Sequence, residues 1–265
     1  MIAIHAMMYR FQCRTHWQLS SLLEQRPWGD IPVPEFKYVM STKADDPFAE
    51  NTKALLKAFS PKLNIEVQEW PADDLTYGLR GHVRKQNLLK ETAEFILFTD
   101  SDMVWHPEYM AKVGVWAERH RGDHRVVAAP RHSMSQGAGY SLIELARADC
   151  AGYTEPLKNA WDRAHTVKTR WSAAGFISGA GFFQLIHVPS VREYMMKTYG
   201  EVFYNKPNRD GADTNILNAN RNEMRSDRSF RIAVEGIIKA PDLSEALHIN
   251  HYRHSDPEWS SHPLH

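Results

Sequence analysis

From residue 1 to residue 106, the pattern of hydrophobic and polar residues alternates between two kinds of segment. The pattern predicts a buried strand over residues 2–8 and further strands over residues 36–41, 64–70 and 95–99. Between them, apolar side chains recur at helical spacing over residues 16–25, 48–59 and 79–92. Strands that alternate with helices of this length predict an α/β fold, with a mainly parallel, Rossmann-like central sheet and helices on both faces.

The pattern is less regular from residue 107 onward. It predicts helices over residues 107–121, 189–199 and 214–222, and strands over residues 125–129 and 230–238. A long variable region covers residues 131–171, and an apolar, glycine-containing segment covers residues 176–187. Because no repeat, low-complexity tract or linker divides the sequence, we expect a single domain over residues 1–265 whose second half elaborates on the first.

Composition and charge exclude several classes of protein. A chain of 265 residues that is 43% hydrophobic can bury a substantial core. Lysine plus arginine equals aspartate plus glutamate, at 32 each, so no overall charge draws the chain to nucleic acid or to an anionic membrane. The sequence has two cysteines, Cys13 and Cys150, which is typical of a reducing compartment. With no secretory signal pattern and no transmembrane segment of about 18 apolar residues, we expect a soluble, cytoplasmic protein.

Two aspartates, Asp100 and Asp102, directly follow the apolar run over residues 95–99. In extended chain their side chains would point the same way, since residues i and i+2 line one face. Mg²⁺ and Mn²⁺ bind carboxylate oxygens and keep positions free for water or phosphate, and ligands of parallel sheets bind beyond the carboxyl ends of the strands. The pair therefore predicts a metal site that holds a nucleotide diphosphate. The alternative is a helix cap or solvated loop before Pro107.

Further motifs follow a fixed order around this pair. The first strand runs into the loop at residues 4–10, and Arg84–Asn87 lie on a predicted helix ahead of the pair. Ser178–Phe183 (Ser-Gly-Ala-Gly-Phe-Phe) and Asp210–Asp213 (Asp-Gly-Ala-Asp) come after it. In this order the motifs resemble those of nucleotide-sugar glycosyltransferases with the GT-A fold, most closely glycosyltransferase family 2, whose Asp-X-Asp motif corresponds to residues 100–102. The resemblance covers most of the chain.

The resemblance implies an enzyme, a hexosyltransferase. Its donor would be a UDP- or GDP-sugar, and its acceptor a hydroxyl group on a saccharide, a lipid-linked saccharide or a small molecule. Residues 1–106 would form the nucleotide-binding half, and residues 107–265 the acceptor-binding half with a C-terminal metal-ligand segment. Residues 41–46, which match the family's base-contacting segment only loosely, leave base recognition open.

Each motif takes a role from the same resemblance. Asp102 would bind Mn²⁺ or Mg²⁺, which neutralises the departing diphosphate as a Lewis acid. The residues assigned to the nucleotide sugar are Ala6, Met7, Arg10, Arg84, Asp100, Ser101 and Arg253. For Arg84, a phosphate clamp and support of the acidic loop are both compatible with the helix face that it shares with Arg80 and Asn87. A solvated basic face is the alternative.

Asp213 is the candidate catalytic base. For inversion, a carboxylate must remove the proton of the acceptor hydroxyl, and Asp213 matches the one acidic position that remains of the family's Glu-Asp motif. Its place before a predicted helix also suits an N-cap. A retaining mechanism stays open, because retaining enzymes of this fold also carry the acidic pair and a late histidine.

The third metal ligand is expected near the end of the sequence, where His248, His251 and His254 lie within seven residues. Enzymes with the GT-A fold often supply a late histidine, and imidazole together with carboxylate suits Mn²⁺. We favour His251, with His248 as the alternative.

Aromatic faces suit sugars, so Trp171 is assigned to the acceptor site. Gly181 is assigned there as well, because residues 178–183 resemble the family's small-residue strand that precedes the acceptor site. Trp105 and Trp161 are further candidates for that site, and core packing is the alternative for each tryptophan. Two other functions stay open. A sugar nucleotidylyltransferase would need a glycine-rich loop after the first strand, and residues 6–10 contain no glycine. A non-catalytic carbohydrate-binding protein on the same fold is also compatible, because fold does not fix function.

Overall fold

The computed structural model describes residues 1–8, 13–71, 80–134, 145–146, 148–150, 155–166, 171–174, 183–199 and 237–249. Its larger sheet has seven strands in the order β10-β6-β9-β4-β1-β2-β3. These strands are β1 (Ile2–Met8), β2 (Phe36–Lys43), β3 (Ile65–Trp70), β4 (Phe95–Asp100), β6 (Val126–Ala128), β9 (Gln184–His187) and β10 (Ile237–Lys239). Strand β9 runs antiparallel to β4 and β6, whereas the other neighbours pair in parallel. The prediction of a mainly parallel sheet is confirmed.

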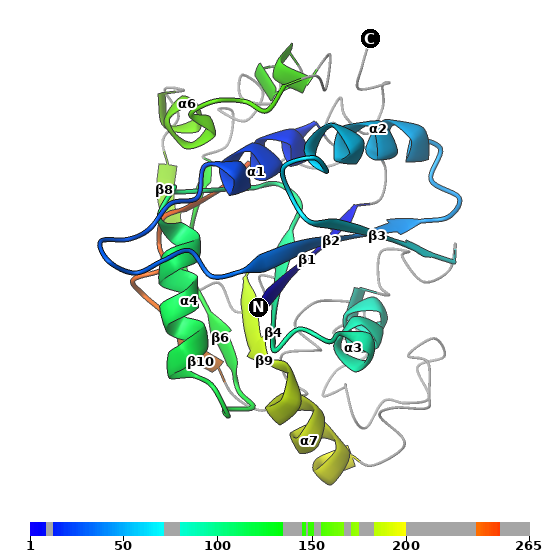
Figure 1. Ribbon diagram of the computed structural model, residues 1–265, viewed down its shortest axis with the longest axis vertical. Helices are drawn as coiled ribbons and strands as arrows, with labels where there is room; N and C mark the ends of the chain where they lie inside the picture. The colour runs from blue at the N-terminus through cyan, green and yellow to red at the C-terminus, as the bar shows by residue number, and fades with distance from the viewer. Residues whose placement is uncertain are drawn as a thin grey trace.

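Helices cover both faces of this sheet, as the sequence predicted (Figure 1). One face packs against α1 (Arg14–Leu23), α2 (Ala49–Phe59) and α4 (Tyr109–Arg119), and the other against α3 (Arg80–Lys90) and α7 (Val188–Tyr199). The short helix α6 (Ala160–Thr166) contacts α1. The alternation of side chains along β1 separates the two cores. Ile2, Ile4, Ala6 and Met8 join the core beneath α1, α2 and α4, while Ala3 joins the core beneath α3 and α7.

A second, smaller sheet connects distant parts of the chain. Its strands are β5 (Met103–Trp105), β7 (Arg131–Met134), β8 (Trp171–Ala174) and β11 (Ala246–His248), in the order β5-β11-β7-β8. Strand β11 pairs antiparallel with β5, so that His248 lies opposite Met103. The N–H of Ile249 also donates to the carbonyl of Asp102 at 3.0 Å. This sheet therefore brings His248 beside the acidic pair. None of the described helices has the length and apolar character needed to span a membrane.

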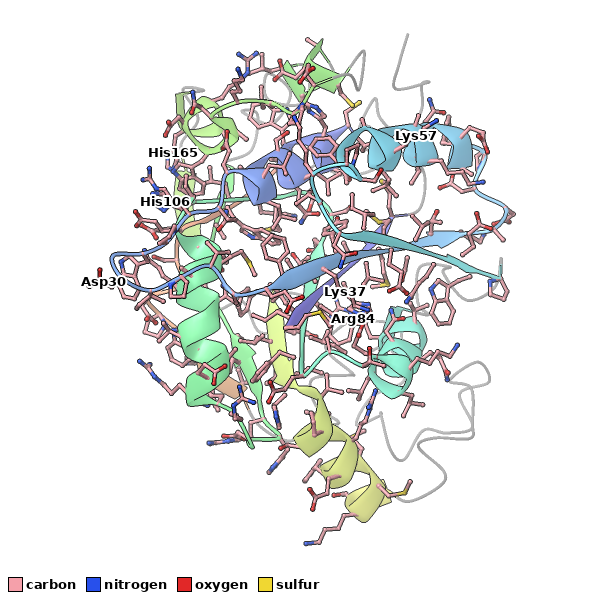
Figure 2. The ribbon with its side chains drawn as sticks, in the orientation of Figure 1. Asp30, Lys37, Lys57, Arg84, His106 and His165 are labelled. Atoms are coloured by element: carbon pink, nitrogen blue, oxygen red, sulfur yellow. The ribbon has the colours of Figure 1, made fainter. Side chains whose placement is uncertain are left out.

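A buried ionic cluster joins β1, β2 and the segment after α3. His5 Nε2 lies 2.8 Å from Glu91 Oε2, and Lys37 Nζ, labelled in Figure 2, lies 3.0 Å from Glu91 Oε1. The N–H groups of Thr92 and Ala93 donate to the same carboxylate at 2.8 Å. Burial opposes ionisation of Glu91, but the hydrogen bonds from His5, Ala93 and Lys37 outweigh it and lower the pKa of Glu91 to about 2. Burial also lowers the pKa of His5.

This cluster predicts that acid destabilises the protein. Both pKa values are lower in the folded chain than the ordinary 6.5 of histidine and 4.5 of glutamate, so the unfolded chain takes up protons first. The free energy of unfolding should therefore fall below pH 6.5 and fall further between pH 4.5 and pH 2. Glu91→Gln should cost about 3 kcal/mol at pH 7, because it breaks a buried pair. Urea unfolding should show this cost shrinking toward pH 3, and a cost that is independent of pH would contradict the assignment.

Candidate metal centre

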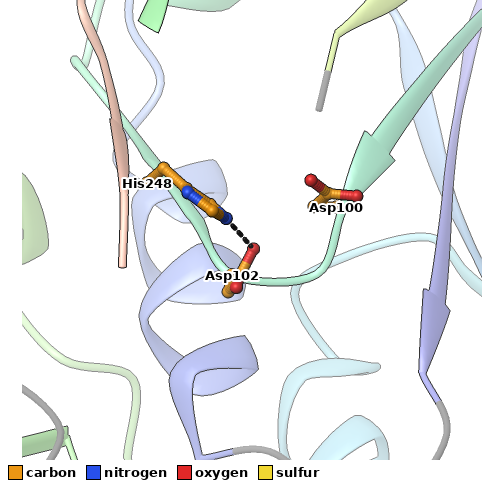
Figure 3. A group of neighbouring side chains, drawn as sticks. All are labelled: Asp100, Asp102 and His248. Atoms are coloured by element: carbon orange, nitrogen blue, oxygen red, sulfur yellow. Dashed lines mark ion pairs between the residues drawn. The ribbon is translucent and has the colours of Figure 1, made fainter. Parts of the chain in front are cut away.

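Asp100, Asp102 and His248 converge at the carboxyl end of β4 (Figure 3). His248 Nε2 lies 3.2 Å from Asp102 Oδ1, and one ligand atom from each of the three residues lies within 4.8 Å of the others. Asp102 and His248 are buried, with 4% and 8% of their surface exposed, and Asp100 is half-buried. Among the described residues, this is the group of acidic and histidine side chains that has the spacing of a metal site.

The two aspartates converge because of a turn. Strand β4 ends at Asp100, Ser101 and Asp102 form a turn, and β5 begins at Met103. The sequence predicted that the two carboxylates point the same way because the chain is extended there. That reason is wrong, since the strand does not continue past Asp100. The turn directs Asp102 toward β11, and the pairing of β5 with β11 delivers His248 to the same place.

The donor set fits a divalent cation. Ligand atoms at about 2.2 Å from one ion lie no more than about 4.4 Å apart, so small side-chain rotations bring these three atoms within range. Two carboxylates and one imidazole suit Mn²⁺, and carboxylates also suit Mg²⁺. Two buried or half-buried carboxylates side by side repel each other, and a cation between them removes that repulsion.

Helix α1 holds the acidic turn in place. Gln18 Nε2 donates to the Asp100 carbonyl at 2.7 Å, and the fully buried Tyr38 hydroxyl donates to Gln18 Oε1 at 2.6 Å. Burial raises the pKa of Tyr38, and the nearby Asp102 charge adds to this effect, so the phenol remains a donor. The hydroxyl of Ser21 accepts from the N–H of Trp105 at 3.2 Å. These contacts fix the main chain on both sides of Asp102.

The sequence predictions did not identify α1 as part of the site. A signal for it was present, because Arg14, Gln18 and Ser21 are spaced by four and three residues and so share one helix face. Polar side chains on a helix that is buried over residues 14–22 require internal partners. Without the fold, however, nothing in the sequence shows that those partners belong to the acidic turn.

Three residues assigned to the nucleotide sugar lie beside this turn. Strand β1 pairs with β4 so that Ala6 lies opposite Thr99 and Met7 opposite Asp100. Ala6 is buried and Met7 half-buried, while Ser101 is buried within the turn itself. The structure thus places these residues at the carboxyl end of the central strands, and their contacts with a nucleotide stay a prediction.

Arg84 is buried, so the alternative of a solvated basic face is wrong for this residue. Its Nη1 donates to Gln184 Oε1 at 2.8 Å, and its guanidinium lies 5.1 Å from the centre of the Phe98 ring. Asn87, on the same helix face, is also buried and donates to Ser41 Oγ at 3.3 Å. These contacts favour a role in supporting the strand that carries Asp100. A direct contact of Arg84 with phosphate stays a prediction.

Of the three tryptophans considered for the acceptor site, two lie in the core and one remains a candidate. Trp105 is buried and stacks on Tyr109, with ring centres 6.0 Å apart, and Trp161 is buried against the rings of His106 and His165. Core packing thus explains Trp105 and Trp161. Trp171 opens strand β8, and its assignment to the acceptor site stays a prediction. The predicted site residues outside the described part of the chain are Arg10, Gly181, Asp213, His251 and Arg253.

His248 and His251 are distinguished by their expected effects on metal binding. His248 lies within the described cluster, whereas the sequence favoured His251. We expect His248→Ala to weaken Mn²⁺ binding by more than about tenfold. Loss of a residue that only orients a metal ligand typically lowers metal affinity 10–100-fold, and loss of the ligand itself should cost more. Electron paramagnetic resonance of free Mn²⁺ measures this affinity. His251→Ala is the matched control. A loss confined to His251→Ala would assign the ligand to that residue instead.

No protein-family model matches this sequence, and no curated protein matches it. Solved structures do match, and the shared architecture is the GT-A fold of nucleotide-sugar glycosyltransferases. The crystal structure of S. aureus TarS aligns with 93% of this chain and 36% of its own, with a TM-score of 0.51 and 16% identity.

Two further matches are complexes. TarS 1–349 in complex with UDP-GlcNAc aligns with 98% of this chain and 61% of its own, with a TM-score of 0.51 and 14% identity. The mannosyltransferase PcManGT from Pyrobaculum calidifontis, in complex with GDP-Man and Mn²⁺, aligns with 97% of this chain and 59% of its own, again with a TM-score of 0.51 and 14% identity. The chain therefore spans about one third to three fifths of these proteins. At this identity, the likeness establishes the fold.

Proposed function

We propose that this protein is a metal-dependent glycosyltransferase that transfers a hexose from a UDP- or GDP-sugar to a hydroxyl acceptor. The observation that carries the proposal is the cluster of Asp100, Asp102 and His248 at the carboxyl end of β4. In open α/β sheets this edge is where ligands bind. The GT-A fold and the sugar-nucleotide complexes of TarS and PcManGT support the same assignment.

The chemistry of the reaction matches the charges of the cluster. Glycosyl transfer leaves negative charge on the departing diphosphate, and bound Mn²⁺ or Mg²⁺ would supply the Lewis acid that stabilises it. Asp102 and His248 would hold the cation, and Asp100 would hold it directly or through water, or contact the ribose. Ala6, Met7 and Ser101 line the adjoining strand ends and would contact the nucleotide.

The acceptor side of the proposal rests on the sequence. We propose an inverting reaction in which Asp213 would act as base and remove the proton of the attacking hydroxyl; a retaining reaction is the alternative. Residues 1–106 would bind the nucleotide and residues 107–265 the acceptor. The acceptor itself would be a saccharide, a lipid-linked saccharide or a small molecule, with Trp171 and Gly181 in its site.

A panel of UDP- and GDP-sugars tests the proposal. The protein is incubated with each donor and Mn²⁺, with chelator in parallel reactions, and release of UDP or GDP is measured. We expect one donor class to be turned over, by transfer to an added hydroxyl compound or by slow hydrolysis, and chelator to abolish the turnover. If no donor is bound or turned over, the enzyme assignment is wrong. Turnover that persists in chelator would instead overturn its metal dependence.

A further inference from the structure

We infer that Arg14 of helix α1 is a positioning residue of the metal centre, fixing both Asp102 and the histidine segment in the arrangement that binds the cation. The inference rests on the proposed metal site and extends it to a residue that would contact neither metal nor substrate. Arg14 is fully buried, on a helix whose residues 14–22 are all buried. A buried guanidinium persists only where it is paired and hydrogen-bonded.

The contacts of Arg14 join the two segments that form the site. Its Nη1 lies 3.5 Å from Asp102 Oδ2 and donates to the carbonyl of Ile249 at 3.0 Å. Ile249 is the residue after His248, and its own N–H donates to the carbonyl of Asp102. The guanidinium thus lies between the acidic turn and the end of β11, which are far apart in the sequence. It contacts the carboxylate through one oxygen and the histidine segment through the main chain.

This geometry gives the two oxygens of Asp102 different tasks. Oδ2 lies on the side of Arg14, while Oδ1 lies 3.2 Å from His248 Nε2. With Oδ2 facing Arg14, Oδ1 is left facing His248, where it would bind a cation as a single oxygen ligand. The other oxygen is already neutralised. Helix α1 supports this arrangement, since Gln18, one turn further along, holds the carbonyl of Asp100.

A positioning role and a simple charge effect predict opposite results. Arg14 carries a positive charge beside a cation site, so by Coulomb repulsion alone its removal should tighten Mn²⁺ binding. If Arg14 positions the ligands, its removal should weaken binding, because Asp102 and His248 lose their fixed orientation. Outer partners of metal ligands typically contribute 10–100-fold in affinity. The sign of the change therefore separates the two explanations.

The test measures Mn²⁺ and Mg²⁺ binding to the full chain without nucleotide, by electron paramagnetic resonance of free Mn²⁺ and by competition with Mg²⁺. We expect Arg14→Met to weaken Mn²⁺ binding by about tenfold or more. We also expect the ratio of Mn²⁺ to Mg²⁺ affinity to fall toward that of His248→Ala, since imidazole favours Mn²⁺. Arg14→Lys keeps the charge but not the planar fork, and should recover part of the loss.

Arg192→Met is the matched control. Arg192 lies on α7 and donates to the main-chain carbonyl of Leu88 at 2.8 and 2.6 Å, so its removal costs similar hydrogen bonds away from the site. Parental or tighter Mn²⁺ binding by folded Arg14→Met would overturn the inference. If circular dichroism shows that this variant does not fold, Arg14→Lys decides: weaker binding supports the inference and parental binding overturns it. Failure of the parent itself to bind Mn²⁺ would overturn the metal site and the inference together.

Discussion

Asp102→Asn is expected to abolish Mn²⁺-dependent binding of nucleotide. The substitution preserves the shape of the side chain and leaves an oxygen that can face Arg14, but it removes the negative charge that a cation requires. Because outer partners alone typically contribute 10–100-fold in metal affinity, loss of an inner carboxylate should exceed about 100-fold. Calorimetric titration of UDP and GDP, with and without Mn²⁺, measures the effect.

Asp123→Asn provides the control for this prediction. Asp123 is also paired with an arginine, Arg125, at 2.7 Å. It precedes β6, which runs in the same direction as β4, since both are antiparallel to β9. Asp123 therefore lies at the amino ends of the parallel strands, whereas Asp100 lies at their carboxyl ends. Its substitution should leave nucleotide binding unchanged, and unchanged binding in Asp102→Asn as well would show that the acidic turn is not the metal site.

Asp213→Asn is expected to abolish turnover while preserving donor binding. A general base typically contributes about 10² to 10⁴ in rate, so kcat should fall by that factor, whereas the affinity for the sugar nucleotide should stay at the parental value. Turnover of the donor identified by the sugar-nucleotide panel gives the rate, and calorimetry gives the affinity.

Asp210→Asn tests whether the effect is specific to Asp213. Both aspartates lie in the segment Asp210–Asp213, so any general disturbance of this segment should affect both variants. The base assignment requires that Asp210→Asn retains most of the turnover. Normal turnover in Asp213→Asn would leave that carboxylate as a helix cap and would remove the support for an inverting mechanism.

The hydrophobic pattern was sufficient to predict strands β1 to β4 of the central sheet. Strands β1 and β4 are long apolar runs, and helices α2 and α3 lie within two residues of their predicted limits. Strands that are buried on both faces are hydrophobic along their whole length. A run of apolar residues therefore predicts their position directly. The acidic pair at the end of β4 was predicted for the same reason, because a polar pair after a buried strand marks the sheet edge.

The smaller sheet could not be predicted in this way. Strands β5 and β11 have three residues each and bind partners far away in the sequence, so no local period identifies them. The placement of His248 depends entirely on this pairing. The sequence therefore favoured His251 on resemblance, although the described cluster contains His248. The contacts of Arg14 with Asp102 and Ile249 could not be predicted for the same reason, since these residues flank β5 and β11.

Asp213, His251 and Arg253 remain predictions from the sequence, as does the division into a nucleotide-binding and an acceptor-binding half. Their support is the order of motifs along the chain, which also predicted the GT-A fold. That fold is confirmed by the solved structures, and it places the carboxyl ends of β1 and β4 side by side.

Anomalous diffraction at the manganese edge, from crystals grown with Mn²⁺ and UDP or GDP, tests the central claim most directly. We predict one strong manganese peak at the carboxyl end of β4, bonded to Asp102 and His248 and to the diphosphate of the nucleotide. A nucleotide bound at this edge without manganese, or manganese bound elsewhere in the chain, would contradict the metal-dependent glycosyltransferase proposed for this protein.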